Sequence, residues 1–426
     1  MSARMHSLSN GVRVVCDPMP GLKTLALVVA VEGGARWEPR DRSGWSHLLE
    51  HLVFKGAGGM SARDIVERIE ARGGSINAAT GYERTSFEVR GVDGALPEAM
   101  QVVSDLVFRP TLDPAEIERE KAVVGQEIAE AFDTPDDHVF EMAQTRAFHG
   151  QALGRPILGS TRSLAPAERD AVADWRARLY SPRRMAVAVS GAVDETELLA
   201  LAEQWFGAEA GVQAEPPEAA RFTGGQARLG RRIEQANLVL ELPGLSAVDP
   251  DLPAMRLLTE ILGGGMASRL FQSAREARGL AYAIDAWHET YADIGVLGVY
   301  AGCAADRADE LARVCAEEIL ALAEQGPTQA EMDRARAVLT ASLWMADESP
   351  MNRAGRLAAQ VLIHGAPRAS ATLAAELAAV DAEAVRRAAR RTLTPRLAST
   401  AVLGPRAAGG AGLVFAESLF PPGTAV

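Results

Sequence analysis

The feature that most constrains the fold of this chain is a weak internal repeat, offset by 213 residues in a chain of 426. The two copies align without gaps. The apolar run 25–29 falls in register with 238–242, and Gly191, which closes one apolar run, falls on Gly404, which closes another. Chance similarity between alanine-rich segments is the alternative, but it would not give collinear matches punctuated by glycine and proline. The repeat therefore predicts a duplicated domain.

The joint between the copies is expected at 211–226, where Gly, Ala, Glu and Pro cluster as they do in linkers. The predicted domains are an N-terminal one at 1–210 and a C-terminal one at 227–426. Hydrophobic residues make up 48% and charged residues 23% of the chain, which is the balance of a globular protein. At roughly 100 to 200 residues per domain, the length also favours two domains.

Each half combines strands with long amphipathic helices. The apolar spacing predicts helices at 61–73, 114–132 and 195–206 in the first half and at 253–262, 328–346 and 381–392 in the second. Alternating polarity predicts a strand over 85–90 with one face toward solvent. The predicted fold class is α+β, with two homologous domains that each pack helices on a mostly antiparallel sheet.

The composition limits the kinds of partner and the cellular location that we expect for this chain. Acidic side chains number 56 against 44 basic ones, for a net charge of −12, which argues against a surface made for nucleic acid or anionic lipid. No apolar run approaches the roughly 18 residues that span a bilayer, and residues 1–16 lack the apolar stretch of a secretory signal. We expect a cytoplasmic protein. Cys16, Cys303 and Cys315 lack metal-type spacing and are expected to be buried thiols.

One short motif points to chemistry, His47-Leu-Leu-Glu50-His51. Positions i, i+3 and i+4 share one face of a helix, so two imidazoles and a carboxylate would converge there. Random placement of 7 histidines and 56 acidic residues would give on the order of 0.015 such matches in the chain. The motif therefore predicts a divalent metal site. The alternative is a solvated helix face with two incidental histidines.

Two imidazoles leave zinc one short of the three protein ligands typical of a hydrolytic site. The best source of a third ligand is the predicted helix 114–132. Its residues Glu120 and Glu127 fall on or beside the apolar stripe, where a carboxylate needs a partner. Spacing alone does not choose between Glu120, Glu127 and Glu130.

The second copy of the repeat lacks this set of residues. The offset places Glu260, Gly263 and Gly264 at the positions of the three polar residues of the motif, and Thr340 at the position of Glu127. One half is therefore expected to be catalytic, and the other to be a duplicated partner without metal.

The motif and its surroundings resemble the pitrilysin family of zinc peptidases, which are inverted zincins. The resemblance extends over nearly the whole chain, and its most specific parts are 44–56, 73–85, 118–137 and 268–282. At this length, with two repeats, the chain is most similar to the short bacterial branch and to the β subunit of mitochondrial processing peptidase. The resemblance implies two domains that form a half-shell.

The resemblance also implies roles for single residues. The cofactor would be Zn²⁺, held by His47, His51 and a distal ligand 76 residues after the second histidine, which is Glu127. Glu50 would be the general base. Glu120 matches an acid next to the site that orients ligands or substrate.

Substrate residues are implied in the same way. Arg275 and Tyr282 match a pair from the second half that reaches substrate in this family. The segment 75–80 resembles the edge strand that binds an extended peptide, which assigns Asn77, Ala78 and Ala79 to substrate binding.

The activity implied is that of a zinc-dependent endopeptidase acting on peptides or unfolded segments inside a chamber closed by two half-shells. One chain supplies one half-shell, so a homodimer is expected, or a heterodimer with a zinc-free homologue. A non-catalytic structural or binding subunit is the alternative, although such relatives usually have a degraded zinc motif. A structural zinc site is less favoured, because those sites commonly use cysteine and four ligands.

Overall fold

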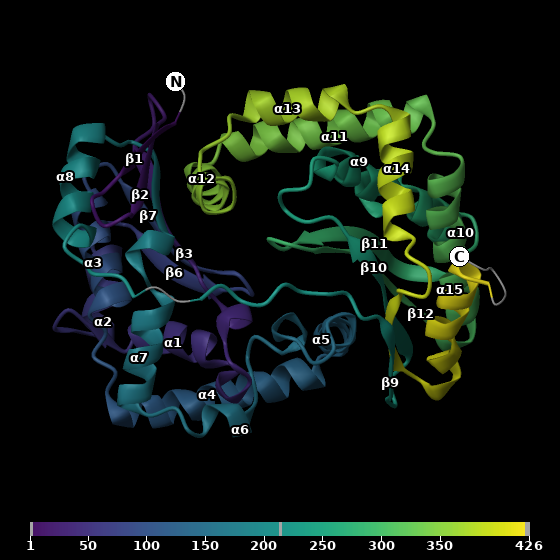
Figure 1. Cartoon of the computed structure of the whole chain (residues 1–426), viewed down its shortest axis with the longest axis horizontal. Coiled ribbons are helices and arrows are strands. Elements are labelled where there is room, and N and C mark those ends of the chain that lie inside the picture. The colour runs from purple at the N-terminus through teal and green to yellow at the C-terminus, as the bar shows by residue number, and fades with distance from the viewer. Residues whose placement is uncertain (1–2, 213–214, 422–426) are drawn as a thin grey trace. The chain divides into compact units, whose positions relative to one another are not determined.

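The computed structural model of the chain describes residues 3–212 and 215–421 (Figure 1). The expected linker at 211–226 includes residues 213 and 214, which lie outside the described residues. The chain divides into two compact units that each take segments from both halves of the sequence. The first unit is Met1–Ile128, Arg155–Glu218 and Trp344–Thr372, and the second is Ala129–Gly154, Ala219–Leu343 and Leu373–Val426. None of the described helices combines the length and the hydropathy that crossing a membrane requires.

The first unit is built on a sheet of six strands in the order β1-β2-β8-β3-β7-β6. All neighbours are antiparallel except β2 and β8, which are parallel. The strands are β1 (Arg4–Ser7), β2 (Arg13–Pro18), β3 (Thr24–Glu32), β6 (Ser75–Thr80), β7 (Arg84–Val92) and β8 (Met185–Gly191). A separate two-residue hairpin joins β4 (Gly56–Ala57) to β5 (Met60–Ser61).

The second unit has a sheet of five strands in the order β11-β12-β10-β13-β9, in which only β13 and β9 are parallel. The strands are β9 (Gly225–Gly230), β10 (Gln235–Gly244), β11 (Ala281–Thr290), β12 (Gly295–Ala304) and β13 (Ser399–Gly404). The repeat positions β3 and β10 are thus both central strands, paired with β8 and β13 respectively.

The glycines that punctuate the repeat have a common physical reason. Gly191 and Gly404 end β8 and β13 with φ angles of 113° and 153°. A Cβ atom at Gly191 would lie 2.3 Å from the carbonyl oxygen of Thr24, and one at Gly404 would lie 2.7 Å from the Cα of Ala236. Both glycines therefore permit a close approach to the neighbouring central strand, near the beginning of β3 in one copy and of β10 in the other.

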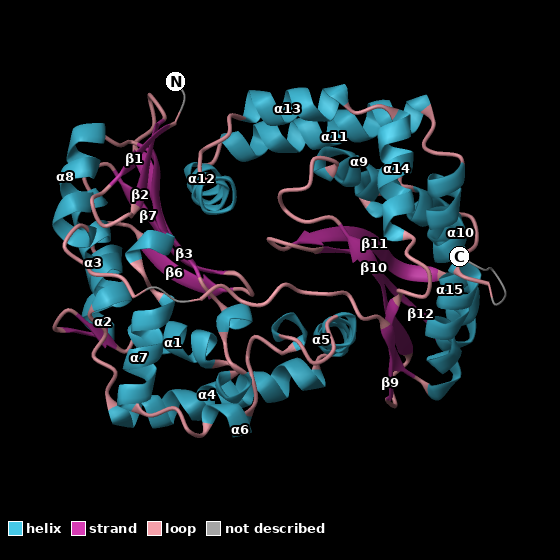
Figure 2. Cartoon of the chain, viewed as in Figure 1, coloured by secondary structure: helices cyan, strands magenta, loops and turns pink. Residues whose placement is uncertain are grey.

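One face of each sheet is covered by helices from the same half of the sequence (Figure 2). In the first unit these are α1 (Trp45–Val53), α2 (Ala62–Glu70), α3 (Leu96–Phe108), α4 (Pro114–Asp133), α7 (Arg169–Leu179) and α8 (Glu195–Phe206). In the second they are α9 (Leu252–Gly263), α10 (Ala308–Glu324), α11 (Gln329–Asp347), α14 (Ala382–Thr392) and α15 (Ala411–Leu419). Two further helices are α6 (Thr161–Leu164) and α13 (Ser370–Ala379).

The other face of each sheet is covered by a helix from the opposite half of the sequence. Helix α5 (Pro135–Ala147) packs Val139 and Ala143 against β10 and β13 of the second unit. Helix α12 (Pro350–His364) packs Ala354 and Ala358 against β3 and β8 of the first unit. The two halves therefore exchange one helix each, which explains the interleaved composition of the compact units.

A buried ion pair fastens the exchanged helix α12 to the first sheet. Asp17 at the end of β2 is fully buried, and the Arg353 Nε atom on α12 donates to its Oδ2 atom at 2.6 Å. A second guanidinium nitrogen of Arg353 contacts Oδ1, and the hydroxyl of Ser190 donates to Oδ2 at 2.9 Å. The Asp17 carboxylate is thus satisfied by a bidentate arginine and a hydroxyl.

The structure confirms the α+β fold class with two units. Each helix expected from apolar spacing is present, with ends shifted by three residues or fewer, and the strand expected at 85–90 is the middle of β7. The three cysteines are free and buried, as expected.

We predict that Arg353→Ala lowers the free energy of unfolding of the first unit by about 3–5 kcal/mol, because it leaves the buried Asp17 carboxylate without its charged partner. Urea unfolding followed by circular dichroism measures this change. Arg63→Ala is the matched control, since Arg63 pairs with Glu67 on an exposed face of α2 and should cost at most about 1 kcal/mol. Equal unfolding midpoints for the two variants would contradict the role given to the Asp17 pair.

Candidate metal centre

Helix α1 carries the motif and is fixed by its own apolar side. Leu48, Leu49 and Leu52 are buried against the sheet of the first unit. The three polar residues of the motif lie on the other side of the helix, where the side chains of His47 and His51 are only 14% and 20% exposed. The two imidazole rings meet edge to face with centroids 4.6 Å apart. The spacing of the motif thus brings the two imidazoles together on one side of the helix, as the sequence predicts.

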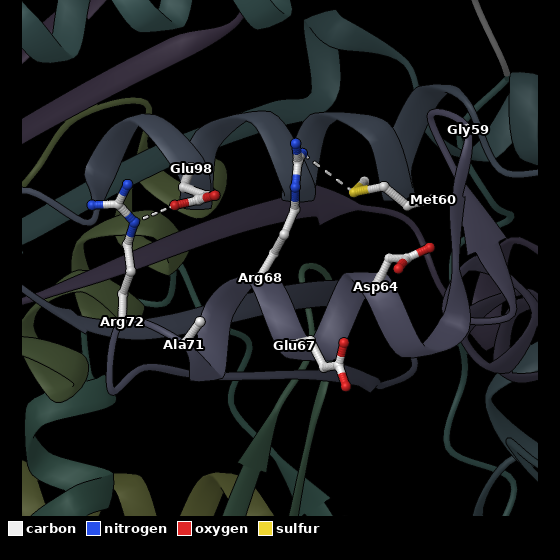
Figure 3. A pocket seen from close by; sticks show the side chains of 8 residues that line it. All are labelled: Gly59, Met60, Asp64, Glu67, Arg68, Ala71, Arg72 and Glu98. Carbon is white, nitrogen blue, oxygen red and sulfur yellow. Dashed lines mark hydrogen bonds and ion pairs between the residues drawn. The ribbon is translucent and has the colours of Figure 1, made fainter.

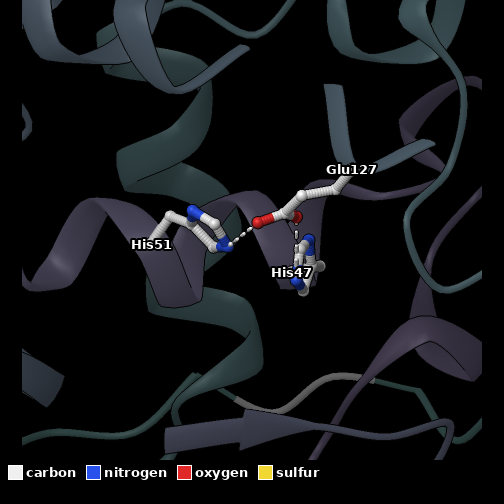
Figure 4. Close-up of side chains that lie close together, drawn as sticks. All are labelled: His47, His51 and Glu127. Carbon is white, nitrogen blue, oxygen red and sulfur yellow. Dashed lines mark ion pairs between the residues drawn. The ribbon is translucent and has the colours of Figure 1, made fainter. Parts of the chain in front are cut away.

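Helix α4 brings a carboxylate to the same point (Figure 4). The Glu127 Oε1 atom lies 3.6 Å from His51 Nε2, and its Oε2 atom lies 3.8 Å from His47 Nε2. Ligand atoms of His47, His51 and Glu127 all lie within 4.8 Å of one another. In the part of the chain that the structure describes, no other group of three His, Cys, Asp or Glu residues could hold a metal in this way.

The three acids of α4 that the sequence left as candidates have different surroundings. Glu127 faces both imidazoles. Glu120 instead lies on the far side of His51, where its Oε2 atom is 3.0 Å from Nδ1. Glu130 is exposed. Geometry thus places Glu127 where a third ligand is needed and Glu120 behind one of the imidazoles.

Glu120 is held in its ionised form by a lysine. Its side chain is 5% exposed, and the Lys55 Nζ atom lies 2.9 Å from Oε1. Burial alone would raise the pKa of Glu120, but the hydrogen bonds from Lys55 and His51 outweigh burial and lower this pKa. An ionised carboxylate can only accept, so Nδ1 of His51 must be the donor. The lone pair of Nε2 is then directed toward Glu127, as a metal ligand requires.

Glu50 and His47 each carry a buried polar atom that has no hydrogen-bond partner among the described residues, Oε2 and Nδ1 respectively. Burial raises the pKa of Glu50, while Thr80 and His51 oppose this rise. Burial, and then the neighbouring His51, lower the pKa of His47 to about 4. A neutral imidazole and a carboxylate of raised basicity are the forms that metal ligation and general-base catalysis use.

The donor set fits a zinc ion. Two imidazole nitrogens and one carboxylate form the three-ligand set of hydrolytic zinc sites, with one position left for water. Atoms bound to one tetrahedral zinc ion at about 2.1 Å lie about 3.4 Å apart, close to the 3.6 and 3.8 Å separations between Glu127 and the two imidazoles.

The residues expected to bind substrate lie in two places. Asn77, Ala78 and Ala79 belong to β6, which pairs with β7 on one side only and is an edge strand of the first sheet. Asn77 and Ala79 are exposed, whereas Ala78 is buried. Helix α1 packs next to this strand.

Arg275 and Tyr282 belong to the second unit. Arg275 lies in a π-helix (Phe271–Glu276) with its guanidinium carbon 4.7 Å from the centroid of the Phe271 ring. Tyr282 lies on β11, an edge strand, and is 62% exposed. Their role toward substrate stays a prediction.

Two residues that sequence reasoning did not single out contribute to the site. Lys55, two residues beyond the end of α1, pairs with Glu120, and its spacing of four residues from His51 could have indicated a neighbour of this imidazole. Glu38 accepts hydrogen bonds from the amides that begin α1. The sequence gives only a weak indication of this role of Glu38. The glycine before the motif indicates that the helix begins without a capping side chain of its own.

A hollow of about 700 Å³ on the first unit has a different character (Figure 3). It is lined by α2, the β4–β5 hairpin and Glu98 of α3. Its charged groups have local structural partners. Arg72 pairs with Glu98, Glu67 pairs with Arg63 on the same helix, a guanidinium nitrogen of Arg68 contacts the Met60 sulfur, and Asp64 closes the capping box of Ser61. These contacts give the charged side chains of the hollow structural roles within the first unit.

Comparison with known proteins agrees with this geometry. The sequence model described as Insulinase (Peptidase family M16) matches residues 13–161, and the one described as Peptidase M16 inactive domain matches residues 166–339. The chain is 34% identical to an uncharacterized zinc protease of Streptomyces coelicolor, over 95% of this chain and 90% of that protein. It is 32% identical to another from Bacillus subtilis, over 92% and 96%.

Solved structures share the fold. A protease from Helicobacter pylori superposes with a TM-score of 0.88 at 19% identity, covering 95% of this chain and 99% of that chain. A chain of complex III2 from Candida albicans gives a TM-score of 0.82 at 18% identity, covering 95% and 96%. The match of residues 166–339 to an inactive domain agrees with the absence of the His-x-x-Glu-His motif from the second half of the sequence.

We predict that Glu127→Ala abolishes stoichiometric zinc binding, because only two imidazoles remain as ligands where a hydrolytic zinc site normally has three protein ligands. Glu120→Ala should weaken zinc binding by about 10- to 100-fold, since it frees the imidazole of His51 to rotate. Competition with a chromogenic chelator measures both affinities. Glu130→Ala removes an exposed acid from the same helix and should leave the affinity unchanged. Loss of zinc in Glu130→Ala but not in Glu127→Ala would contradict the assignment.

Proposed function

The chain belongs to the insulinase family of peptidases, family M16, and we propose that it is a zinc-dependent endopeptidase acting on peptides or unfolded polypeptide segments. Relatives that match over nearly their whole length are named zinc proteases, which supports a protease role. The observation that carries the proposal is the convergence of His47, His51 and Glu127, with the partnerless Oε2 atom of Glu50 on the same helix.

In this proposal His47, His51 and Glu127 hold the zinc ion. When bound, zinc supplies Lewis acidity that lowers the pKa of water and polarises the scissile carbonyl. Glu50 takes the proton of the attacking water and transfers it to the leaving amine nitrogen. Its buried position favours this role, because burial raises the basicity of the carboxylate. Glu120 keeps the imidazole of His51 in its orientation and is itself held by Lys55.

The substrate backbone is proposed to add to the free edge of β6. An edge strand presents unpaired amides and carbonyls, so an extended peptide can extend the sheet by main-chain hydrogen bonds. The exposed positions of Asn77 and Ala79 would accommodate substrate side chains, and Ala78 would keep the strand in register on its buried side. Recognition of this kind tolerates many sequences.

Arg275 and Tyr282 are proposed to complete the site from the second unit. A phenol hydroxyl can donate a hydrogen bond to the oxyanion of the tetrahedral intermediate, and a guanidinium can hold a substrate carbonyl. The exposure of Tyr282 supports this role, because a core tyrosine could not reach a substrate. The family resemblance is the other support.

Glu50→Gln should lower kcat by about 10²- to 10⁴-fold while zinc stays bound. Tyr282→Phe should lower kcat by about 10²-fold or more if its hydroxyl stabilises the oxyanion. Cleavage of a quenched fluorescent peptide, with zinc content measured on each sample, gives these values. Glu130→Gln, an exposed acid on α4, is the matched control and should behave as the parent.

Three outcomes of this assay are informative. Full activity of Glu50→Gln would exclude Glu50 as the base. Zinc bound to an inactive parent, across a varied set of peptides, would favour a non-catalytic binding subunit. Absence of zinc from the parent after loading would contradict the metal site.

The chain is further proposed to act as a homodimer whose two copies enclose a chamber, so that only small or unfolded substrates enter. Possession of both the metal set and the Arg275–Tyr282 pair in one chain supports two identical subunits over a division of labour. Light scattering at working concentrations should give about twice the 45.2 kDa of one chain. A monomer mass would contradict the homodimer, and full activity only after addition of a zinc-free homologue would favour a heterodimer.

A further inference from the structure

Helix α1 begins in an unusual way. Its N-cap residue is Gly44, which has a φ angle of 91° and offers no side chain to the free amides of the first turn. A Cβ atom at Gly44 would lie 2.5 Å from the carbonyl oxygen of Leu158 and 2.9 Å from the Cα of Gly159. Neither serine, threonine, aspartate nor asparagine can therefore stand at this position, although these residues normally cap helices. The acceptor for these amides must come from elsewhere in the chain.

Glu38 supplies that acceptor. Its Oε2 atom accepts from the amide of Gly44 at 2.8 Å, and its Oε1 atom accepts from the amide of Ser46 at 2.7 Å. The side chain is buried, with 4% exposed. A carboxylate here satisfies two amides and places negative charge at the positive end of the helix. His47 follows Ser46 directly, and the other two polar residues of the motif lie one turn further on.

Burial of the Glu38 carboxylate carries a desolvation cost, which its hydrogen bonds and a nearby arginine partly offset. Burial raises the pKa of Glu38 to about 7, although the amides of Ser46 and Gly44 and the charge of Arg155 all oppose this rise. The guanidinium of Arg155 also donates to the backbone carbonyl of Glu38. The residue is therefore fixed at both its carboxylate and its main chain.

The same segment is bound to the turn that follows the proposed substrate strand β6. The amide of Ala35 donates to the carbonyl of Gly81 at 3.1 Å, and that of Arg36 donates to the carbonyl of Tyr82 at 2.8 Å. The hydroxyl of Tyr82 donates to the carbonyl of Arg155 at 3.2 Å. Glu38 thus lies between the beginning of α1 and the β6–β7 turn, and both elements share one support.

We propose that Glu38 is a positioning residue, whose carboxylate caps α1 and sets the rotation of this helix, so that His47, Glu50 and His51 face the metal and the substrate strand. The inference rests on the proposed function for its catalytic consequence. Glu38 acts through the backbone of α1, and its removal should misplace the metal ligands together with the general base.

The test uses Glu38→Gln in the full chain, loaded with zinc or with Co²⁺ as a spectroscopic probe. Glutamine keeps the volume, but its NH₂ group must face one of the two amides, which then lacks an acceptor. We expect zinc affinity to fall by about 10- to 100-fold, as for other groups that orient ligands. The visible absorption spectrum of the cobalt form should change. Peptide cleavage should show kcat lowered by about tenfold or more, with KM within about twofold.

Asp17→Asn is the matched control. Asp17 is an equally buried carboxylate of the same unit and accepts from Arg353 and Ser190, but it caps no part of α1. This variant should lower stability while its cobalt spectrum and zinc affinity stay like those of the parent. If Glu38→Gln does not fold, Glu38→Asp, which keeps the charge but is one methylene shorter, undergoes the same measurements.

The outcomes separate this inference from the proposed function. A changed cobalt spectrum and weakened zinc binding in Glu38→Gln support the positioning role, even if the parent cleaves no peptide and the peptidase proposal fails. A folded Glu38→Gln with the spectrum, zinc affinity and kcat of the parent would overturn the inference. Equal changes in Asp17→Asn would overturn it too, because they would reflect general loosening of the unit.

Discussion

Both central sheets are apolar on both of their faces, and this constraint governs the rest of the structure. Along β3, alternate residues such as Leu27 and Val28 enter different cores, one under the helices of the same half and one under α12. β10 repeats the pattern with Leu238 and Val239. Each half supplies enough helices for one face only, so the second face must be covered by a helix from the other half. In this duplicated chain, each half supplies the helix that covers the second face of the sheet of the other half.

The metal site is built on this doubly covered sheet. Helix α1 buries three leucines in the core and has one side left for polar residues, so apolar packing limits its rotation and directs the imidazoles to the polar side, while the cap from Glu38 completes their placement. Helix α4 is less buried and can present acids at two depths, with Glu127 toward both histidines and Glu120 behind one of them. Ligation then depends on side chains that are half-buried, held by neighbours and open on one side. The support from Glu38 and Lys55 fits this requirement, because short polar contacts define orientation more sharply than apolar packing does.

Much of the fold and of the metal site could be predicted from the sequence. The features that could not be predicted depend on contacts between segments that are distant in the sequence. Local periodicity predicts α8 with its correct ends, because amphipathic spacing is a property of one helix. Spacing alone does not choose between Glu120, Glu127 and Glu130, since residues seven apart lie on nearly the same side of a helix and residues three apart are neighbours on its surface. Only the packing of α4 against α1 separates them. Local spacing also does not show that α5 and α12 cover the sheet of the opposite half. Helix α12 has an apolar stripe that includes Met351, Leu357 and Val361, but such a stripe does not identify the sheet that it packs against. The capping role of Glu38 depends on the close approach of Gly44 to Leu158 and Gly159, more than a hundred residues later in the sequence, which leaves no room for a capping side chain at Gly44.

The second copy shows why the duplicated fold kept the sheet but not the chemistry. Glu260 and Gly263 on α9 and Gly264, which follows its last residue, occupy the positions of the motif, and Gly263 stands where the first copy has Glu50. A Cβ atom at Gly263 would lie 2.4 Å from the backbone nitrogen of Ala286 on β11. Backbone that cannot move aside leaves no room for any side chain, so the strand has closed over the place where a general base would project. The loss of the metal set is therefore fixed by packing as well as by residue identity, and returning the histidines alone would not reopen the site.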